Sequence, residues 1–332
     1  MPFLQLQLER VKKSKPYKGL KVLQNIPLTF ETIVKLEILI EGGADVYTTS
    51  PSFMEVDANL LSAFTESGGR FLTSNQILDQ DFDIHLDCAA ELLHKKPPKI
   101  GTVEITGTGT NKYGEADLSF PVISIDLSPV KYLEGVLGTG EAFVRAFKQL
   151  TSENIAHKKF MIFGYGKVGR GMAHYLRKEE AEVIVVEKNE QFLEQARKAG
   201  FQCVHAADTY KIETIVKNCF CVATATGREN VISQHYNSSV FKNRYLANMG
   251  GDDEFGPDFL PEEVMCRKRP INFFIDKPTL LRYLDPVFYA HNMAIDILLL
   301  HPFKKGLHPF PAFIADEIVI TWQKIFNEAI DY

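Results

Sequence analysis

The sequence predicts an α/β protein with two domains. Three observations predict it: the chain has 332 residues, apolar strand-like runs alternate with amphipathic helical stretches in both halves, and a glycine-rich turn near the middle joins a strand pattern to a helix pattern. Alternation of this kind is typical of parallel sheets covered by helices. The length is sufficient for two separate cores.

The first domain is expected over residues 1–137. It starts with a short strand at 21–23 and an amphipathic helix at 29–41, which Gly42 and Gly43 end. The other elements expected in this domain are strands at 45–49, 82–86, 99–103 and 122–125, and a second helix at 57–67.

The stretch from Lys158 to Glu187 has a complete βαβ pattern. An apolar run at 160–163 predicts a buried strand, residues 172–178 predict a helix, and a second apolar run at 183–186 ends on Glu187. A bare glycine pattern in a loop would lack this context, so the stretch favours a nucleotide-binding unit.

Three glycines in the turn of this unit have the G-x-G-x-x-G spacing. The first permits a tight turn, the second lets the backbone approach a pyrophosphate, and the third lets the helix pack closely on the strand. Because a carboxylate at Glu187 can accept hydrogen bonds from a ribose 2′-hydroxyl, we predict a Rossmann-type domain that binds NAD rather than NADP. The predicted cofactor-binding residues here are Gly164, Gly166, Lys167, Val168, Gly169 and Glu187.

The rest of the chain is expected to complete this second domain and then leave it. A hinge helix is predicted at 138–150, and the Rossmann domain at 151–284, with further strands at 219–225, 245–248 and 272–275. The segment 285–332 is expected to return to the first domain, so that the two domains flank a cleft and are joined by a double hinge.

Composition excludes several classes of protein. The net charge of −5 gives no reason to expect nucleic acid or an anionic membrane as a partner, and the hydrophobic (45%) and charged (24%) fractions are ordinary for a soluble protein. The N-terminal stretch lacks a signal-peptide pattern, and apolar runs such as 294–300 are too short to span a bilayer. Five cysteines without a metal-type C-x-x-C pair predict reduced thiols, no metal and a cytoplasmic location.

Six segments, in order, resemble the S-adenosylhomocysteine hydrolase (adenosylhomocysteinase) family over nearly the whole chain. They are LTFETIVKLEILIEGGADV, VEITGTG, the run 120–151, GYGKVGRGMA, ATATG and NMGG. The resemblance implies that tightly bound NAD oxidises a ribose 3′-hydroxyl, which allows a 5′-thiol to be eliminated and water to add before the ketone is reduced again. It also implies a small-molecule substrate, nucleoside or sugar-like, and a homo-oligomer.

The same resemblance implies roles for individual residues. Lys131 matches the lysine that helps remove the hydroxyl proton, Glu134 lies near the family's aspartate, Asp87 matches an acid/base aspartate, and Glu104 matches the glutamate that holds ribose hydroxyls. The residues expected on the substrate side are Thr29, Glu31 and Asp57. The further residues expected to face NAD are Thr106, Thr108, Thr224, Ala225, Gly227 and Asn248.

Six of these residues also have a purely structural interpretation. Asp87 could cap a helix that starts at Cys88, and Glu31 could complement a helix dipole in the first turn. Lys131 could be solvated with Glu134 as its i,i+3 partner. The two threonines of the VEITGTG segment could be ordinary turn residues.

The chain departs from the family at three histidines, where it has Pro27, Gly251 and Asp285. In the family, these histidines belong to the set that protonates the leaving group and recognises adenine. We therefore expect a substrate related to S-adenosylhomocysteine rather than that compound itself. His85, which shares a strand face with Asp87, and His291 are the candidates to stand in for them.

Three alternative functions stay open. The chain could be a catalytically silent, regulatory NAD-binding relative of the hydrolase. It could be an NAD-dependent 2-hydroxyacid-type dehydrogenase, although Asn248-Met249-Gly250 lacks the arginine which that class places after a strand. The βαβ stretch also resembles the nucleotide-sensing domain of potassium-channel regulators, but only locally, up to Asp208.

Overall fold

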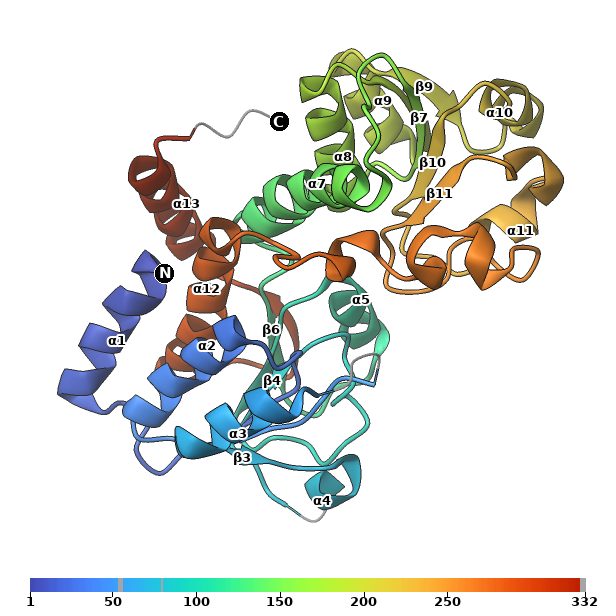
Figure 1. Ribbon diagram of the computed structural model, residues 1–332. Helices are drawn as coiled ribbons and strands as arrows, with labels where there is room; N and C mark the ends of the chain where they lie inside the picture. Colours follow the sequence, from blue (N-terminus) through green and yellow to red (C-terminus); the bar gives the residue numbers. More distant parts are fainter. Residues whose placement is uncertain (53–55, 79, 329–332) are drawn as a thin grey trace. The chain divides into compact units, whose positions relative to one another are not determined.

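A computed structural model describes residues 1–52, 56–78 and 80–328. The chain forms two compact units, one made of Met1–Leu133 and Leu281–Ile330 and the other of Glu134–Leu280. The prediction of a two-domain α/β protein is confirmed, and the chain passes twice between the units (Figure 1).

The first unit is built on a seven-stranded parallel sheet with the order β12-β6-β5-β4-β1-β2-β3. From β1 the chain adds strands in one direction, and from β4 it adds them in the other. The point where the order reverses lies between β1 and β4, which is where open parallel sheets bind ligands. The strands are β1 (Lys21–Gln24), β2 (Asp45–Thr48), β3 (Arg70–Phe71), β4 (Ile84–Asp87), β5 (Gly101–Glu104), β6 (Pro121–Ser124) and β12 (Gly306–Pro309).

Helices from both ends of the chain cover this sheet. α1, α2 and α12 pack against one another, so the C-terminal segment lies beside the N-terminal helix (Figure 1). α2 begins where Thr29 and Thr32 form a reciprocal capping box, and it ends at Gly42. The helices of this unit are α1 (Pro2–Ser14), α2 (Phe30–Glu41), α3 (Ala58–Glu66), α4 (Ser74–Leu78), α5 (Gly107–Glu115), α6 (Val130–Tyr132), α12 (Leu281–Leu300) and α13 (Ala312–Phe326).

A carboxylate from α12 caps the start of α1. The two oxygens of Asp285, a fully buried side chain, accept hydrogen bonds from the backbone N–H groups of Phe3 (2.9 Å) and Leu4 (3.0 Å). The first N–H groups of a helix have no partner within the helix, and a negative charge there is favourable. Asp285, which stands where the resembled family has a histidine, therefore has a structural partner in this chain.

We expect Asp285→Ala to lower the free energy of unfolding by about 2 kcal/mol, because the substitution leaves two buried N–H groups without an acceptor. Urea denaturation followed by circular dichroism measures this effect. Asp316→Ala, on the exposed face of α13, is the matched control and should change little. An unchanged unfolding free energy for Asp285→Ala would show that the cap is dispensable.

The second unit has a five-stranded parallel sheet with the order β11-β10-β7-β8-β9. The strand order reverses between β7 and β10, and α8 (Lys167–Lys178) connects β7 to β8 as predicted from the βαβ pattern. The strands are β7 (Lys159–Phe163), β8 (Glu182–Glu187), β9 (Gln202–His205), β10 (Cys221–Thr224) and β11 (Tyr245–Asn248). The other α-helices are α7 (Thr139–Thr151), α9 (Glu190–Lys198), α10 (Thr209–Val216) and α11 (Val231–His235).

α7, the helix predicted at the hinge, belongs to the second unit and packs along α8. The two helices approach at glycines: a Cβ added to Gly140 would lie 2.3 Å from the carbonyl carbon of Gly171. A Cβ on Gly171 would lie 2.0 Å from the carbonyl oxygen of Val136. Only glycine permits this approach, and the close contact with α7 fixes the position of α8.

One predicted strand is wrong. Residues 271–274 form a short 3-10 helix, η5 (Ile271–Phe274), between Pro270 and Pro278. Both prolines lack the N–H that a sheet ladder needs, so an apolar run between them does not extend the sheet. All five cysteines are free thiols. Among the described residues, no helix has the length and hydrophobicity required to cross a membrane.

Candidate functional site

Two carboxylates meet at the carboxyl edge of the first unit's sheet. Asp87 ends β4 and Glu104 ends β5, and the parallel register makes them partner positions with side chains on the same face. Both side chains are fully buried. They lie beside the reversal point between β1 and β4, where a ligand site is expected.

Asp87 is surrounded by four hydrogen-bond donors. One carboxylate oxygen accepts from the Asn25 amide (3.2 Å) and the Cys88 N–H (2.8 Å), and the other accepts from the Tyr113 hydroxyl (2.6 Å) and the Leu92 N–H (3.0 Å). A carboxylate has about four acceptor positions, so this set fills them. Residues 88–95 form turns, so Asp87 organises a turn and does not cap a helix.

Glu104 keeps one acceptor position open. One oxygen accepts from the N–H (2.7 Å) and the hydroxyl (2.6 Å) of Thr106, and the other accepts from the Ala90 N–H (3.1 Å). Gly109 in α5 lies directly against this carboxylate, where a Cβ would approach to 2.2 Å. Three donors leave room for one more hydrogen bond, which a substrate hydroxyl could supply.

The turn beside Glu104 has a strained backbone. Ala89 and Ala90 both have positive φ angles, 61° and 56°, which alanine rarely adopts. Their N–H groups donate to the Thr106 hydroxyl (3.0 Å) and to Glu104. Strain of this kind persists where the surroundings fix it, and it concentrates at functional sites.

Burial dominates the titration of this carboxylate pair. Desolvation raises the pKa of Asp87 to about 6, against the hydrogen bonds that it accepts. Desolvation, with the charge of Asp87 as the second cause, raises the pKa of Glu104 to about 7. Two neighbouring carboxylic acids with pKa values near neutrality can hold and release a proton, as acid–base catalysis requires.

These raised pKa values predict a pH dependence of stability. Because the folded pKa of Glu104 lies above its ordinary value of 4.5, its contribution is fully present in acid and is lost as pH rises through about 7. From pH 5 to pH 8 the urea midpoint of the parent protein should therefore fall relative to that of Glu104→Gln, in which the other buried groups titrate as in the parent. Parallel pH profiles of the two proteins would contradict the assignment.

The other residues predicted in or beside the first unit's site are spread over several elements. Lys131 lies in α6 and is only 8% exposed, so it is not the solvated lysine of the structural interpretation. Thr29 and Asp57 cap α2 and α3, respectively. The carboxylate of Glu31, in the first turn of α2, receives no hydrogen bond from any described residue. Glu134 is the first residue of the second unit.

Two threonines of the VEITGTG segment have different surroundings. Thr106 caps α5, with its hydroxyl oxygen accepting from the Gly109 N–H (3.0 Å) while it donates to Glu104. Thr108 is exposed. Thr106 therefore organises the carboxylate, which is more than the ordinary turn interpretation assigns to it.

Neither candidate histidine has a charged partner. His85 is buried next to Phe82, both of its ring nitrogens lack a hydrogen-bond partner among the described residues, and desolvation lowers its pKa to about 4. His291 bonds the carbonyl of Val103 (3.0 Å), and desolvation, the charge of Lys35 and, to a smaller extent, that of Lys131 lower its pKa. Both imidazoles are therefore neutral near pH 7.

In the second unit, the glycine loop lies at the reversal point between β7 and β10. Gly164 has a φ of 97°, and a Cβ there would lie 2.4 Å from the carbonyl oxygen of Ala225. A Cβ on Gly169 would lie 2.0 Å from the carbonyl oxygen of Gly164. Gly166 differs from both, because no atom lies within 4 Å of an added Cβ.

Glu187 is held in place by the backbone around it. Its oxygens accept from the N–H groups of Tyr165 (2.7 Å), Lys188 (2.8 Å) and Asn189 (2.8 Å). One acceptor position is left for a ribose hydroxyl. No described side chain caps the N-terminus of α8 at Gly166, so this helix end can receive a pyrophosphate. These residues fit a dinucleotide.

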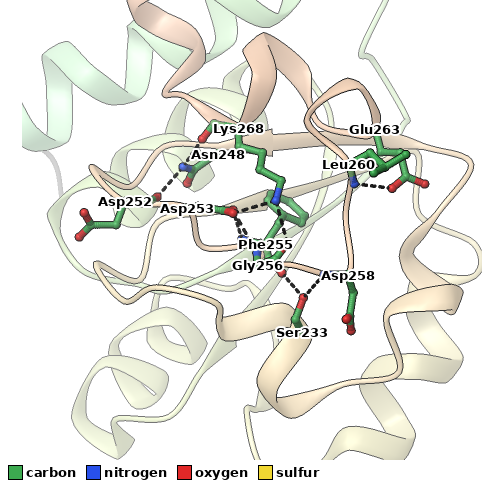
Figure 2. A network of polar contacts seen from close by, with 10 residues as sticks. All are labelled: Ser233, Asn248, Asp252, Asp253, Phe255, Gly256, Asp258, Leu260, Glu263 and Lys268. Atoms are coloured by element: carbon green, nitrogen blue, oxygen red, sulfur yellow. Dashed lines mark hydrogen bonds and ion pairs between the residues drawn. The ribbon is translucent and has the colours of Figure 1, made fainter. Parts of the chain in front are cut away.

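Of the remaining residues predicted to face NAD, Thr224 ends β10, Ala225 and Gly227 follow it, and Asn248 ends β11. The hydroxyl of Thr224 donates to the amide oxygen of Asn248 (3.2 Å). The amide nitrogen of Asn248 donates to the carbonyls of Asp252 (2.7 Å) and Lys268 (2.6 Å), so its hydrogens are used within the protein (Figure 2). Gly227, with a φ of 67°, has open space around an added Cβ. No cluster of metal-ligating side chains occurs in the described part of the chain.

Gly166→Ala separates cofactor binding from folding. The backbone there has a φ of −69° and there is open space for a Cβ, so the apo protein should keep its melting temperature. We expect NAD affinity to fall by about tenfold or more, because the methyl group occupies the place where a pyrophosphate approaches the backbone. Calorimetric titration of the NAD-free protein with NAD measures the change. Unchanged affinity would place the pyrophosphate elsewhere.

Comparison with known proteins identifies sequences that are similar to this chain. Residues 135–268 match the family described as "S-adenosyl-L-homocysteine hydrolase, NAD binding domain". The chain is 29% identical over 288 residues to the S-inosyl-L-homocysteine hydrolase of Methanocaldococcus jannaschii, covering 79% of this chain and 68% of that protein. It is also 29% identical to the adenosylhomocysteinase of Sulfurisphaera tokodaii, covering 75% of this chain and 64% of that one.

Residues 135–268 therefore carry the NAD-binding domain of the S-adenosylhomocysteine hydrolase family, and most of the chain is similar to hydrolases of this kind. The chain spans about two thirds of the length of these relatives. NAD is the cofactor of the second unit, as predicted from the glycine loop. Among solved structures, a dipicolinate synthase protein from Bacillus halodurans aligns with a TM-score of 0.48 and 13% identity, over 86% of this chain and 99% of that one.

Several residues of this candidate site were not predicted from the sequence. Asn25, just after β1, and Tyr113, in α5, reach Asp87, and Glu254 bonds the loop after β10. Asn25 directly follows a strand next to the reversal point, so its position could have revealed it. Lys35 is fully buried in α2, where its amine donates to Gln24 (2.7 Å) and desolvation lowers its pKa.

Proposed function

We propose that this chain is an NAD-dependent hydrolase that oxidises the ribose of a purine-nucleoside thioether transiently and cleaves its carbon–sulfur bond. The observation that carries the proposal is the buried carboxylate pair Asp87 and Glu104 at the ligand-binding edge of the first unit. The second unit supplies the NAD-binding domain of a hydrolase family. The family match favours this function over the dehydrogenase and potassium-channel sensor alternatives.

Each residue has a role that follows from its surroundings. When bound, NAD supplies a hydride acceptor. Glu104 accepts a hydrogen bond from a ribose hydroxyl in its open position and, with a pKa near neutrality, can take up and return a proton. Asp87, whose acceptor positions are filled, positions Asn25 and Tyr113. Lys131, buried in α6, is the proposed base for the hydroxyl proton.

The proposed substrates are S-inosyl- and S-adenosylhomocysteine, the compounds named in the two relatives. They share the ribose and the thioether, so the same carboxylate and cofactor would serve both. Pro27 replaces a histidine of the family, and the hydroxyl oxygen of Thr29 accepts from the Thr32 N–H in the cap of α2. Among the residues predicted on the substrate side, Glu31 has a carboxylate that receives no hydrogen bond from a described residue. Its acceptor oxygens suit an N–H donor on the base. A carboxylate can accept from the N1–H of hypoxanthine or from the 6-amino group of adenine, so both thioethers are test substrates, although the missing family histidines did not favour S-adenosylhomocysteine.

The experiment uses the full chain as purified. Denaturation and mass spectrometry should release NAD in about one equivalent per chain. Incubation with each thioether in heavy water should release homocysteine, detected with a thiol reagent, and should exchange the 4′-hydrogen of the ribose for deuterium. Exchange without homocysteine release would restrict the function to the oxidation half of the cycle. The absence of both reactions would overturn the proposal.

A second candidate is an NAD-binding regulator without turnover. Two observations favour it: Asp285, at the position of a family histidine, caps α1, and all acceptor positions of Asp87 are filled within the protein. Bound NAD with neither deuterium exchange nor homocysteine release would select this candidate. Assembly into a homo-oligomer stays a prediction, which light scattering would test.

A further inference from the structure

The loop after β10 forms one side of the NAD site in the second unit. This loop, Ala225–Gly227, lies so close to the glycine loop that Gly164 has no room for a Cβ beside the carbonyl of Ala225. The two loops follow the strands on either side of the reversal point, where a dinucleotide binds. The position of Ala225–Gly227 therefore sets the shape of the site.

The carboxylate of Glu254 anchors this loop through hydrogen bonds. Its two oxygens accept from the N–H (2.8 and 3.0 Å) and the hydroxyl (2.8 Å) of Thr226, and one of them also accepts from the N–H of Gly227 (2.7 Å). The side chain is fully buried, and a Cβ on Gly250 would lie 2.0 Å from one of its oxygens. A buried carboxylate with this many backbone donors is a fixed anchor, because breaking it would expose several polar groups without partners.

The segment that carries Glu254 is itself fixed. The N–H of Asn230 donates to the carbonyl of Asp253 (2.8 Å), and the N–H of Ile232 donates to the carbonyl of Glu254 (3.1 Å). Lys268 reaches across this segment, and its amine contacts the Asp253 carboxylate (2.8 Å) and the carbonyl of Gly256 (2.7 Å). Figure 2 shows Lys268 between these two groups.

Lys268 lies at the end of a strained turn. Cys266, Arg267 and Lys268 all have positive φ angles, 50°, 53° and 68°, in a run without glycine. The turn aims the carbonyl of Lys268 at the amide of Asn248, which ends β11, while its amine reaches Asp253. A run of this kind is unfavourable for L-residues and needs contacts that fix it. Asn248 and Asp253 provide them.

We propose that Glu254 and Lys268 are positioning residues for the cofactor: Glu254 holds the Ala225–Gly227 loop in its NAD-binding shape, and Lys268 locks the segment that carries Glu254. Neither residue contacts the reacting atoms. The loop is then ordered before NAD arrives, which improves affinity because less order has to be gained on binding. This inference concerns NAD binding and stands apart from the proposed hydrolysis, so the two can fail independently.

The test measures NAD binding to the NAD-free full chain by calorimetry. We expect the NAD dissociation constant to rise by about tenfold or more in Glu254→Ala, less in Glu254→Gln, and by about threefold or more in Lys268→Met. Lys268→Arg should restore most of the affinity because it keeps a donor for Asp253. Amide hydrogen exchange of Thr226 and Gly227 in the NAD-free protein should accelerate in the first three variants, a change that general destabilisation would not confine to this loop.

Lys242→Met is the matched control. Lys242 forms a comparable ion pair with Glu263 (3.0 Å) in the same region but does not bond the Ala225–Gly227 loop. Its NAD dissociation constant should stay within about twofold of the parent value. Parent-like affinity in Glu254→Gln and Lys268→Met, or an equal loss in the control, would overturn the proposal. If Glu254→Ala does not fold, the two milder variants decide.

Discussion

Glu104→Gln is expected to lower turnover by about a hundredfold or more while the purified protein keeps its NAD. Glutamine has nearly the same volume but neither the charge nor the proton affinity of the carboxylate. The carboxylate lies at the ligand-binding edge of the sheet and keeps one acceptor position open, which suits a ribose hydroxyl. Rates of homocysteine release, compared at saturating substrate, measure the effect.

Glu115→Gln is the matched control for this prediction. Glu115 is exposed at the end of α5, the same helix that packs against Glu104, so its turnover should equal that of the parent. If Glu104→Gln keeps turnover within about threefold of the parent and retains NAD, Glu104 has no role in the reaction. If it loses NAD as well, the effect is on folding and must be separated by the unfolding free energy.

Gly171→Ala is expected to lower the free energy of unfolding by about 3 kcal/mol or more. The new methyl group would lie 2.0 Å from the carbonyl oxygen of Val136, and backbone atoms cannot move aside as a side chain can. The turn Leu133–Gly138, which holds Val136 and leads into α7, would have to move away from α8. The N-terminus of α8 is the one predicted to face the cofactor. NAD binding should therefore weaken together with stability.

Urea denaturation of the NAD-free protein measures this prediction. Gly251→Ala is the control, because no atom lies within 4 Å of an added Cβ there, and it should change the unfolding free energy by no more than about 0.5 kcal/mol. A Gly171→Ala protein as stable as this control would show that the turn Leu133–Gly138 can shift at little cost. Gly166→Ala, which affects the ligand and not the fold, completes the comparison.

The sequence predicted elements whose signals are local. The helix at 29–41 and the βαβ stretch at 158–187 have periodic apolar patterns and clear ends, and both are present. α1 and β12 were not predicted, because α1 is capped by Asp285 and β12 pairs with β6, in each case from far along the chain. The predicted strand at 272–275 had apolar residues but flanking prolines, and the prolines decided its conformation.

For the site, a similar division holds. The glycine loop and Glu187 were predicted from their spacing, and Glu104 and Asp87 from family resemblance. Tyr113 was not predicted, because only the packing of α5 on the sheet brings its hydroxyl to Asp87. Lys35 was also missed, because a lysine in an amphipathic helix predicts an exposed side chain, and the structure buries it completely. The spacing of apolar residues in one helix does not reveal that another element buries its polar face.

The divided first unit has a consequence for how the protein is made. β12, α12 and α13 come from the last part of the chain, and α12 packs against α1 and α2. The second unit is one continuous segment that ends before them. During synthesis, the second unit can fold while the first still lacks an edge strand and the helix that carries Asp285. NAD can therefore be bound by the nascent chain before α12 and β12 have been made, and a ligand bound at this stage stabilises the second unit.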